Sequence, residues 1–192
     1  MGRRAFWTVA AMAAVVLVAA LALSTVDQVV REGELPLADA SIIREQAAAK
    51  HLDPALIAAV IYAETKFEPR PSAAGAEGLM QLLPSTAYFI AHLSGGVAFT
   101  AGDLATPRIN LAYGSYYLRY LLDHYEGDEM LAVAAYNGGI SNVDEWVAEA
   151  RAQGRQLTIG AIPFPETREY VQRVLEAQRE YRRRYPSELG LR

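Results

Sequence analysis

The chain has 192 residues, enough for one globular domain and an appendage but too few for two full domains. It contains no cysteine, which excludes disulfide bonds, a thiolate nucleophile and any metal site built on cysteine. Its 18 basic and 22 acidic residues give a net charge of −4, which argues against DNA, RNA or anionic lipid as the main partner.

The first distinct segment is an apolar run over residues 5–23 that contains no charge and follows two arginines. Its length nearly matches the roughly 20 residues that cross a bilayer. It predicts a transmembrane anchor within residues 1–25, with the N-terminus in the cytoplasm and the remainder on the cell-wall or periplasmic side. A cleaved signal peptide is the alternative, because Ala20-Leu21-Ala22 resembles a cleavage site, and the chain would then be secreted.

A short charged segment without sustained periodicity, residues 26–37, follows as a stalk or linker. Without the two N-terminal arginines, 16 basic and 22 acidic residues remain, so the exported part has a net charge of −6. His51, His92 and His124 are scattered and lack the i, i+4 spacing of paired ligands, so we expect no metal site.

Residues 38–186 carry the start signals of successive helices, and a tail of residues 187–192 follows. Asp53 precedes a proline, and Thr106 precedes another, which is typical of a capped helix that begins with proline. The expected helices run from residue 39 or 41 to 49, from 54 to 64, from 84 to about 92, from 107 to about 127, from 130 to 136, from 141 through 147, and from 166 to about 184.

The remaining segments of the expected domain are loops. Residues 67–78 are rich in proline, alanine and glycine, and residues 154–165 have no helical period. The chain has no internal repeat, heptad run or convincing strand alternation. We therefore expect a mainly α, globular helical domain with at most a small β element, behind one N-terminal transmembrane helix.

Glu64 is the residue that points most directly to chemistry. Leu56, Ile57, Val60 and Ile61 recur at helical spacing, and position 64 falls on the same stripe. Burial raises the pKa of a carboxylic acid, which suits a general acid that works near neutral pH. The alternative is a glutamate at the helix end that turns to solvent or pairs with an arginine.

Three further segments carry residues that could line one cleft together with Glu64. Each of these segments also has a purely structural interpretation. The glycines can be turns, an Asn-Gly-Gly sequence can be a helix cap, and a tyrosine on an apolar helix face can belong to the core. The four segments are Glu64-Thr65, the glycine-rich residues 72–81, residues 135–139 and residues 166–171.

Together and in this order, these segments resemble the catalytic domain of the soluble-lytic-transglycosylase type, within the lysozyme-like superfamily. The likeness spans residues 38–185. It is carried by Ala-Glu-Thr near residue 64, Gly-Leu-Met-Gln at 78–81, Ala-Tyr-Asn-Gly-Gly at 135–139, and Ile-Pro-Phe-Pro-Glu-Thr-Arg-Glu-Tyr-Val at 162–171.

The resemblance implies cleavage of the β-1,4 bond between N-acetylmuramic acid and N-acetylglucosamine in the glycan strands of peptidoglycan. Such enzymes form 1,6-anhydromuramoyl ends without water, cofactor or metal. The resemblance makes Glu64 the general acid and then the base, with Tyr170 beside it to orient it or the acetamido group. The substrate-binding positions that it implies are Thr65, Ser72, Gly78, Met80, Gln81, Tyr136 and Asn137.

Glycosidases normally use two carboxylates, and Glu64 has no obvious buried companion in the sequence. Glu68 and Glu77 lie in the loop, and Asp103 lies outside any apolar period, so we assign all three to solvent. In the scheme that the resemblance implies, the sugar's own acetamido oxygen and 6-hydroxyl supply the missing groups. Two alternatives stay open: a muramidase that hydrolyses the same bond, and a non-catalytic scaffold that binds peptidoglycan.

The sequence departs from the family pattern at three points. Threonine at position 65 replaces the usual serine, and Leu83 stands where methionine is frequent. The loop after Glu64 is one residue shorter than the common pattern, which affects the register of Ser72. None of these departures removes the proposed acid.

Overall fold

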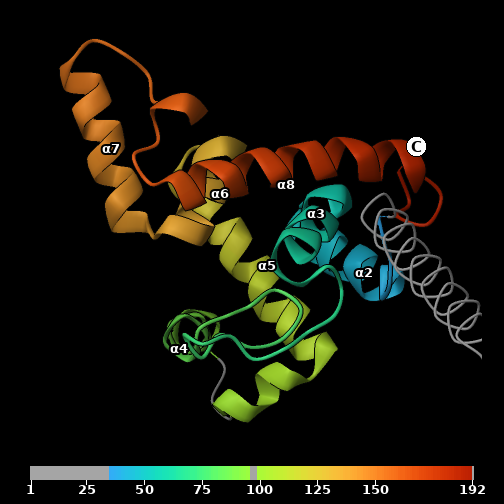
Figure 1. Cartoon of the computed structure of the whole chain (residues 1–192). Coiled ribbons are helices and arrows are strands. Elements are labelled where there is room, and N and C mark those ends of the chain that lie inside the picture. Colours follow the sequence, from blue (N-terminus) through green and yellow to red (C-terminus); the bar gives the residue numbers. More distant parts are fainter. Residues whose placement is uncertain (1–34, 96–98, 192) are drawn as a thin grey trace, which may run out of the picture. The chain divides into compact units, whose positions relative to one another are not determined.

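The computed structural model describes residues 35–95 and 99–191 (Figure 1). The chain divides into two units at residues 35 and 36, and everything that follows concerns the second unit. The transmembrane anchor predicted within residues 1–25, and residues 26–34 of the predicted stalk, lie outside the described residues. Among the residues that are described, no helix combines the length and the apolar character that a membrane span requires.

The described part of the chain is mainly helical, as predicted. Its one β feature there is an isolated antiparallel bridge between Glu77 and Leu82. The helices are α2 (Ala40–Lys50), α3 (Pro54–Thr65), α4 (Pro84–Ser94), α5 (Pro107–His124), α6 (Glu129–Gly138), α7 (Ile140–Ala152) and α8 (Pro165–Arg184), with the 3-10 turns η1 (Ala101–Ala105) and η2 (Ile159–Ala161).

Proline and capping signals in the sequence mark the starts of several helices. Asp53 accepts a hydrogen bond from the Ala55 N–H at 3.0 Å and so caps α3. Asp128 caps α6 in the same way. Thr106 stands before α5 but its side chain makes no capping hydrogen bond, so the proline that follows it defines this start.

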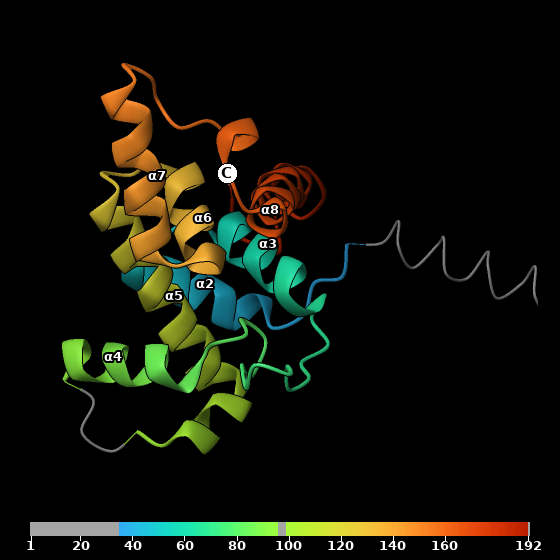
Figure 2. The ribbon, with the colours of Figure 1, turned by 60° about the vertical axis from the view of Figure 1, so that its left-hand side comes forward.

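The core is built around α3, whose residues 55–61 are all buried. This helix packs along α8, and α6 also packs against α8. Figure 2 views α8 nearly end-on and shows α3 beside it. Because α3 is apolar on nearly every side, it is a central helix rather than an amphipathic surface helix.

A second group of elements packs against α5. Helix α4, the turn η1 and the loop between α3 and α4 gather there, as Figures 1 and 2 show. Leu82, Ala87 and Leu104 form a small buried cluster, and four aromatic side chains pack against it. The long α5 therefore joins the core around α3 to the loop that carries the glycine-rich segment.

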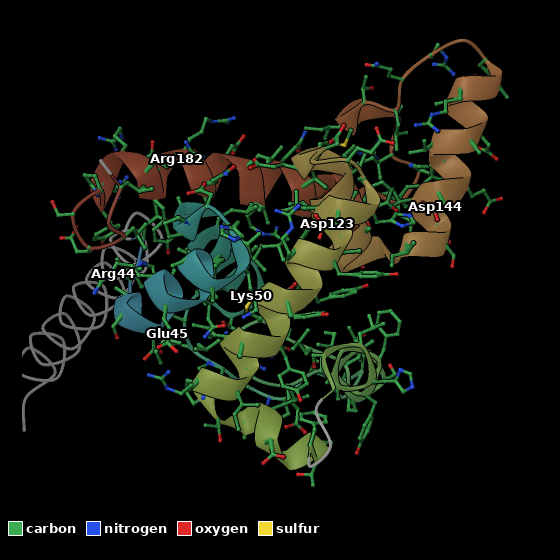
Figure 3. All side chains as sticks on the ribbon, turned by 180° about the vertical axis from the view of Figure 1, so that it is seen from behind. Arg44, Glu45, Lys50, Asp123, Asp144 and Arg182 are labelled. Atoms are coloured by element: carbon green, nitrogen blue, oxygen red, sulfur yellow. The ribbon has the colours of Figure 1, made fainter. Side chains whose placement is uncertain are left out.

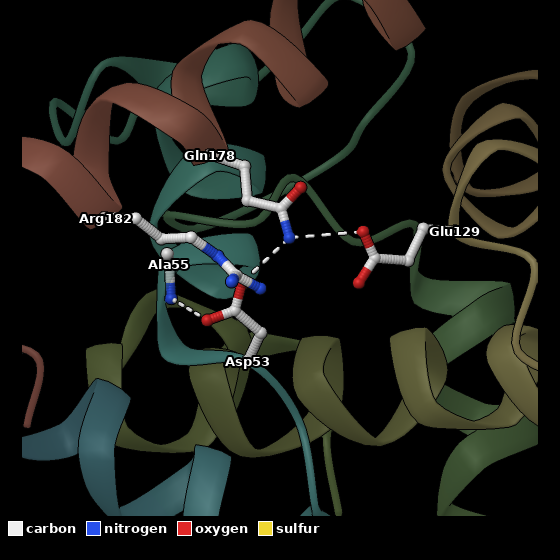
Figure 4. A network of polar contacts seen from close by, with 5 residues as sticks. All are labelled: Asp53, Ala55, Glu129, Gln178 and Arg182. Carbon is white, nitrogen blue, oxygen red and sulfur yellow. Dashed lines mark hydrogen bonds and ion pairs between the residues drawn. The ribbon is translucent and has the colours of Figure 1, made fainter. Parts of the chain in front are cut away.

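A partly buried polar network fixes α3 against α8 (Figure 4). Asp53 Oδ2 accepts hydrogen bonds from Gln178 Nε2 at 2.7 Å and from Arg182 Nε at 3.1 Å. Gln178 also donates to Glu129 Oε2 at 3.2 Å, which includes α6 in the network. One carboxylate therefore caps α3 and sets the position of α8 along it.

Many other charged side chains lie on the outer surface, among them Glu45, Asp123 and Asp144, which Figure 3 labels. Glu45 pairs with Arg108 at 2.7 Å, and Asp123 pairs with Arg119 at 2.7 Å. Exposed pairs of this kind contribute at most about 1 kcal/mol each, so the fold depends little on them.

The residues after α8 fold back toward α2. In the segment that the sequence suggested as a tail, Leu189 is only 1% exposed. The Arg44 guanidinium of α2 donates to the carbonyl oxygen of Glu188. This segment thus contributes an apolar side chain to the packed unit.

Candidate active site

Glu64 lies in the last turn of α3, at the edge of the core. Lys66 follows with φ at +51° and ends the helix there. The Thr65 hydroxyl lies 3.1 Å from the carbonyl oxygen of Ile61 and 2.9 Å from that of Leu79. This contact ties the end of α3 to the glycine-rich loop. The Glu64 side chain beside it is half-buried.

The side chain of Tyr170 is a direct polar partner of the Glu64 carboxylate. The Tyr170 hydroxyl donates to Glu64 Oε1 over 2.7 Å. Tyr170 is 2% exposed, so its ring cannot turn away into solvent. The guanidinium carbon of Arg173 lies 5.8 Å from the centre of this ring, one helical turn further along α8.

Burial raises the pKa of Glu64 from 4.5 to about 7. The hydrogen bond from Tyr170 and the positive charge of Arg173 both oppose this rise, and the negative charge of Glu166 adds to it. At neutral pH about half of such groups are protonated, so the acid form and the base form are both available.

Glu64 lines a hollow of about 360 Å³ between the α3–α6 region and the glycine-rich loop. This volume lies in the range of small-ligand sites. Five of the nine site residues predicted from the sequence line it, namely Glu64, Ser72, Gln81, Tyr136 and Asn137. The lining also includes Leu83, Thr86, Tyr117 and Glu166, to which the sequence analysis gave no role.

The other four predicted site residues do not line this hollow but support those that do. Met80 and Thr65 are buried, at 0% and 4% exposure, and Tyr170 lies behind Glu64. Gly78 has φ at +75°, a conformation that glycine adopts without strain. These four residues therefore pack beneath the lining residues and help to set the shape of the hollow.

The glycine-rich loop is held by Asn110 of α5, a site residue that the sequence analysis missed. Asn110 is fully buried, accepts from the Met80 N–H at 2.8 Å and donates to the Glu77 carbonyl at 2.9 Å. The signal was present, because position 110 shares a helical stripe with Gly114 and Leu118. A polar residue on a buried stripe requires polar partners.

Gln81 and Ser72 present polar groups to the hollow from this loop. The amide nitrogen of Gln81 donates to the carbonyl oxygens of Gly78 at 2.8 Å and Arg70 at 3.0 Å. Its Oε1 atom is therefore the group that Gln81 offers as an acceptor. Ser72 Oγ accepts from the Ala76 N–H at 2.9 Å, which leaves the hydroxyl hydrogen of Ser72 for donation.

The end of α6 also lines the hollow. The Tyr136 hydroxyl donates to the carbonyl oxygen of Met80 at 2.9 Å and so joins α6 to the loop. Asn137 accepts a hydrogen bond from the Thr167 hydroxyl at 2.8 Å. Asn137 and Glu166 also line a second hollow of about 340 Å³ in front of Phe164.

Glu166 is the carboxylate that the sequence analysis overlooked as a neighbour of Glu64. It is exposed in the first turn of α8 and lines the same hollow. Glu68 is exposed, and Asp103 accepts from the Thr100 N–H and hydroxyl at the start of η1. Within residues 35–95 and 99–191, no cluster of three or more histidine, aspartate or glutamate side chains could hold a metal ion.

Comparisons of this chain with known proteins agree on one family. The family model described as "Transglycosylase SLT domain" matches residues 41–159. The chain belongs to this family of transglycosylase SLT domains, and its helical fold is the lysozyme-like fold expected from the sequence.

Among curated proteins, the soluble lytic murein transglycosylase of Escherichia coli strain K12 is 29% identical over 154 residues, which cover 79% of this chain and 24% of that protein. The transglycosylase of Enterobacteria phage PRD1 is 39% identical over 103 residues, covering 53% of this chain and 35% of that protein. The chain thus spans about a quarter of the length of the Escherichia coli relative.

Solved structures give the same match. The 70-kDa soluble lytic transglycosylase from Escherichia coli superimposes with a TM-score of 0.75 at 28% identity, over 84% of this chain and 26% of that one. An inactive mutant of the lytic transglycosylase Slt from Pseudomonas aeruginosa gives a TM-score of 0.73 at 31% identity, over 82% of this chain and 25% of that one. The 70-kDa enzyme is also among the matches as a complex with bulgecin A.

Proposed function

We propose that this chain is a peptidoglycan lytic transglycosylase that cleaves the β-1,4 bond between N-acetylmuramic acid and N-acetylglucosamine. The observation that carries the proposal is the hydrogen bond from the buried Tyr170 to Glu64, which itself lines a hollow of about 360 Å³. The lytic transglycosylase names of its relatives support the same reaction.

In the first step, the protonated Glu64 donates its proton to the glycosidic oxygen as the bond to the muramoyl anomeric carbon breaks. The acetamido oxygen of the same sugar stabilises the positive charge that develops at that carbon. A pKa of about 7 keeps a large fraction of Glu64 protonated at neutral pH, which this step requires.

In the second step, the Glu64 carboxylate accepts the proton of the muramoyl 6-hydroxyl while that oxygen bonds to the anomeric carbon. The 1,6-anhydro ring closes, and Glu64 returns to its protonated form without consuming water. The nucleophile belongs to the substrate itself, which gives it a large advantage in effective concentration over water. Tyr170 holds the carboxyl in one orientation during both steps.

A hydrolytic muramidase is the second candidate, and the position of Glu166 is the observation that favours it. A second carboxylate lining the hollow could serve as a base for a water molecule or as a nucleophile. Its exposure argues for the transglycosylase, because a solvated carboxylate at the mouth of the hollow is poorly held for either role.

Mass spectrometry of the muropeptides released from isolated sacculi separates these candidates. The transglycosylase reaction gives an anhydro product that is one water lighter than the hydrolysis product. We expect the anhydro product from the full-length chain and about 10²- to 10⁴-fold slower release from Glu64→Gln. Equal release by both chains would overturn the catalytic role and favour a scaffold that only binds peptidoglycan.

We also propose that residues 1–25 anchor the enzyme in the cell membrane, with the catalytic domain on the cell-wall or periplasmic side. The uncharged run at residues 5–23, which follows two arginines, supports this orientation. In fractionated cells, an anchored chain stays in the membrane pellet after alkaline washing and keeps its full mass. A soluble chain shortened near Ala22 would instead identify a cleaved signal peptide.

A further inference from the structure

Asn137 lies at the junction of the two hollows. It is the last residue but one of α6, and it lines both the hollow of Glu64 and the neighbouring hollow in front of Phe164. The end of α6 packs beside the start of α8, as Figure 1 shows. A ligand that extends from one hollow to the other therefore passes the side-chain amide of Asn137.

The buried Thr167 side chain makes a hydrogen bond to this amide. The Thr167 hydroxyl donates to Asn137 Oδ1 at 2.8 Å, and Thr167 is only 2% exposed. The fit around it is close, since a Cβ added at Gly138 would lie 3.1 Å from the Thr167 hydroxyl oxygen and 3.2 Å from its methyl group. Asn142 Nδ2 also donates to the Gly138 carbonyl at 2.7 Å and closes the end of α6.

We propose that Thr167 is a positioning residue that fixes the Asn137 amide, so that its NH₂ group faces the glycan as a hydrogen-bond donor. The hydroxyl that donates to Oδ1 occupies one of its two lone pairs and holds the carbonyl side of the amide toward Thr167, so both Nδ2 hydrogens stay available as donors to the ligand. Without Thr167, the amide can turn over and present either its oxygen or its nitrogen. This role rests on the proposed function, because it names the group that receives the saccharide.

The glycine-rich loop, which lines the same hollow, offers the complementary group. The amide nitrogen of Gln81 is directed at the Gly78 and Arg70 carbonyl oxygens, so Gln81 presents its oxygen as an acceptor. An N-acetylated sugar carries an amide with one carbonyl acceptor and one N–H donor. A fixed donor at Asn137 and a fixed acceptor at Gln81 therefore suit an acetamido group, with the acetamido carbonyl assigned to Asn137.

A double-mutant cycle in the full-length chain tests whether Thr167 acts through Asn137. We expect Thr167→Val, which removes the hydroxyl and keeps the shape, to lower kcat/KM on isolated sacculi about 10-fold, mainly through a higher KM. Thr167→Ser should restore most of the loss. In the Asn137→Ala chain, Thr167→Val should have no further effect.

The matched control is Thr158→Val, because Thr158 is exposed and its side chain makes no capping hydrogen bond. If Thr167 has a purely structural role, the effects of Thr167→Val and Asn137→Ala on kcat/KM should multiply in the double variant. The fall in kcat/KM of Thr167→Val should then also follow its loss of Tm. Either that result, or unchanged kcat/KM in Thr167→Val, would overturn the positioning role while leaving the lytic reaction in place.

Binding separates this role from the lytic reaction itself. In the Glu64→Gln background, co-sedimentation with intact sacculi measures affinity without turnover. Weaker binding of Thr167→Val in that background supports the positioning role even if the wild-type chain releases no anhydro product. Absence of both cleavage and sacculus binding by the wild-type chain would overturn the proposed function and this role together.

Discussion

The hydroxyl of Tyr170 donates to Glu64 Oε1 over 2.7 Å, and the two residues are 106 positions apart in the chain. Their approach depends on the packing of α3 along α8, which the Asp53 network holds at the far end of the same helix pair. A tyrosine that donates to a half-buried carboxyl stabilises its charged form, yet burial still dominates the pKa of Glu64. The pair thus combines an available proton with a fixed orientation.

Tyr170→Phe should lower kcat on sacculi about 10-fold, because the carboxyl of Glu64 loses the donor that orients it. It should also raise the pKa of Glu64 above about 7, since the lost hydrogen bond favoured the charged form. The first step needs protonated Glu64, so the alkaline limb of the pH–rate profile should move to higher pH. The profile of kcat against pH measures both effects.

Tyr181→Phe is the matched control for that substitution. It also removes a buried hydroxyl from α8, but the Tyr181 hydroxyl donates to the carbonyl oxygen of Pro36 at 2.6 Å, away from the hollow. It should lower Tm and leave the alkaline limb unchanged. An equal shift of the limb in both variants would contradict a specific role for Tyr170.

Stability should fall as pH rises from about 4.5 to about 7 because of Glu64. Its folded pKa of about 7 lies above the ordinary 4.5, so the folded chain binds the proton more tightly than the unfolded chain. The resulting stability is fully present below pH 4.5 and is lost as pH rises through 7. The loss amounts to at most about 3.5 kcal/mol, because each unit of pKa difference corresponds to about 1.4 kcal/mol.

Glu64→Gln checks this linkage, because glutamine fills the same space, can still accept from Tyr170 and does not titrate. At pH 8 the variant should be more stable than the wild-type chain, and near pH 4 the two should be similar. Denaturant unfolding at several pH values gives the comparison. Parallel pH profiles of the two chains would mean that Glu64 carries no raised pKa.

The local features of the fold were predictable from the sequence. Proline after Asp53 marks the start of α3, because a capping carboxylate and a fixed φ both favour a helix there. The apolar stripe that ends at Glu64 predicted a carboxyl at the edge of the core, and the structure has a half-buried Glu64 on a hollow. These features depend on residues within one or two helical turns of each other.

The features that the sequence analysis missed depend on contacts between distant segments. Thr167 meets Asn137 across 30 positions, and Asn110 meets the Met80 N–H across 30 positions. No periodicity within a single helix encodes such a partner. Glu166 carries no signal of burial in the sequence, because it reaches the hollow as an exposed side chain of the first turn of α8.

Gly78→Ala should destabilise the chain by about 3 kcal/mol or more, because both the backbone and the space around it require glycine. Its φ is +75°, and an added Cβ would overlap the Asn110 side chain and lie 2.5 Å from the Leu104 carbonyl oxygen. The loop that carries Gln81 should shift as Asn110 is displaced, so activity should fall as well. Thermal unfolding and release from sacculi measure the two effects.

Gly75→Ala separates backbone strain from steric overlap. Gly75 has a similar φ of +78°, but an added Cβ there would meet nothing within 4 Å. It should cost only the strain of a left-handed alanine, about 1–2 kcal/mol. Equal losses at both positions would show that the contact between Gly78 and Asn110 contributes nothing.

Glu166→Gln and Arg173→Gln should move the alkaline limb of activity in opposite directions. Glu166 raises the pKa of Glu64 and Arg173 lowers it, so the first variant should shift the limb to lower pH and the second to higher pH. Both chains should still release the anhydro product, because each charge acts on Glu64 without joining the reaction. Two results together would instead assign Glu166 to catalysis and the chain to the muramidases. The first is a loss of activity of about 10²-fold or more in Glu166→Gln but not in Arg173→Gln, and the second is a hydrolysed product from the wild-type chain.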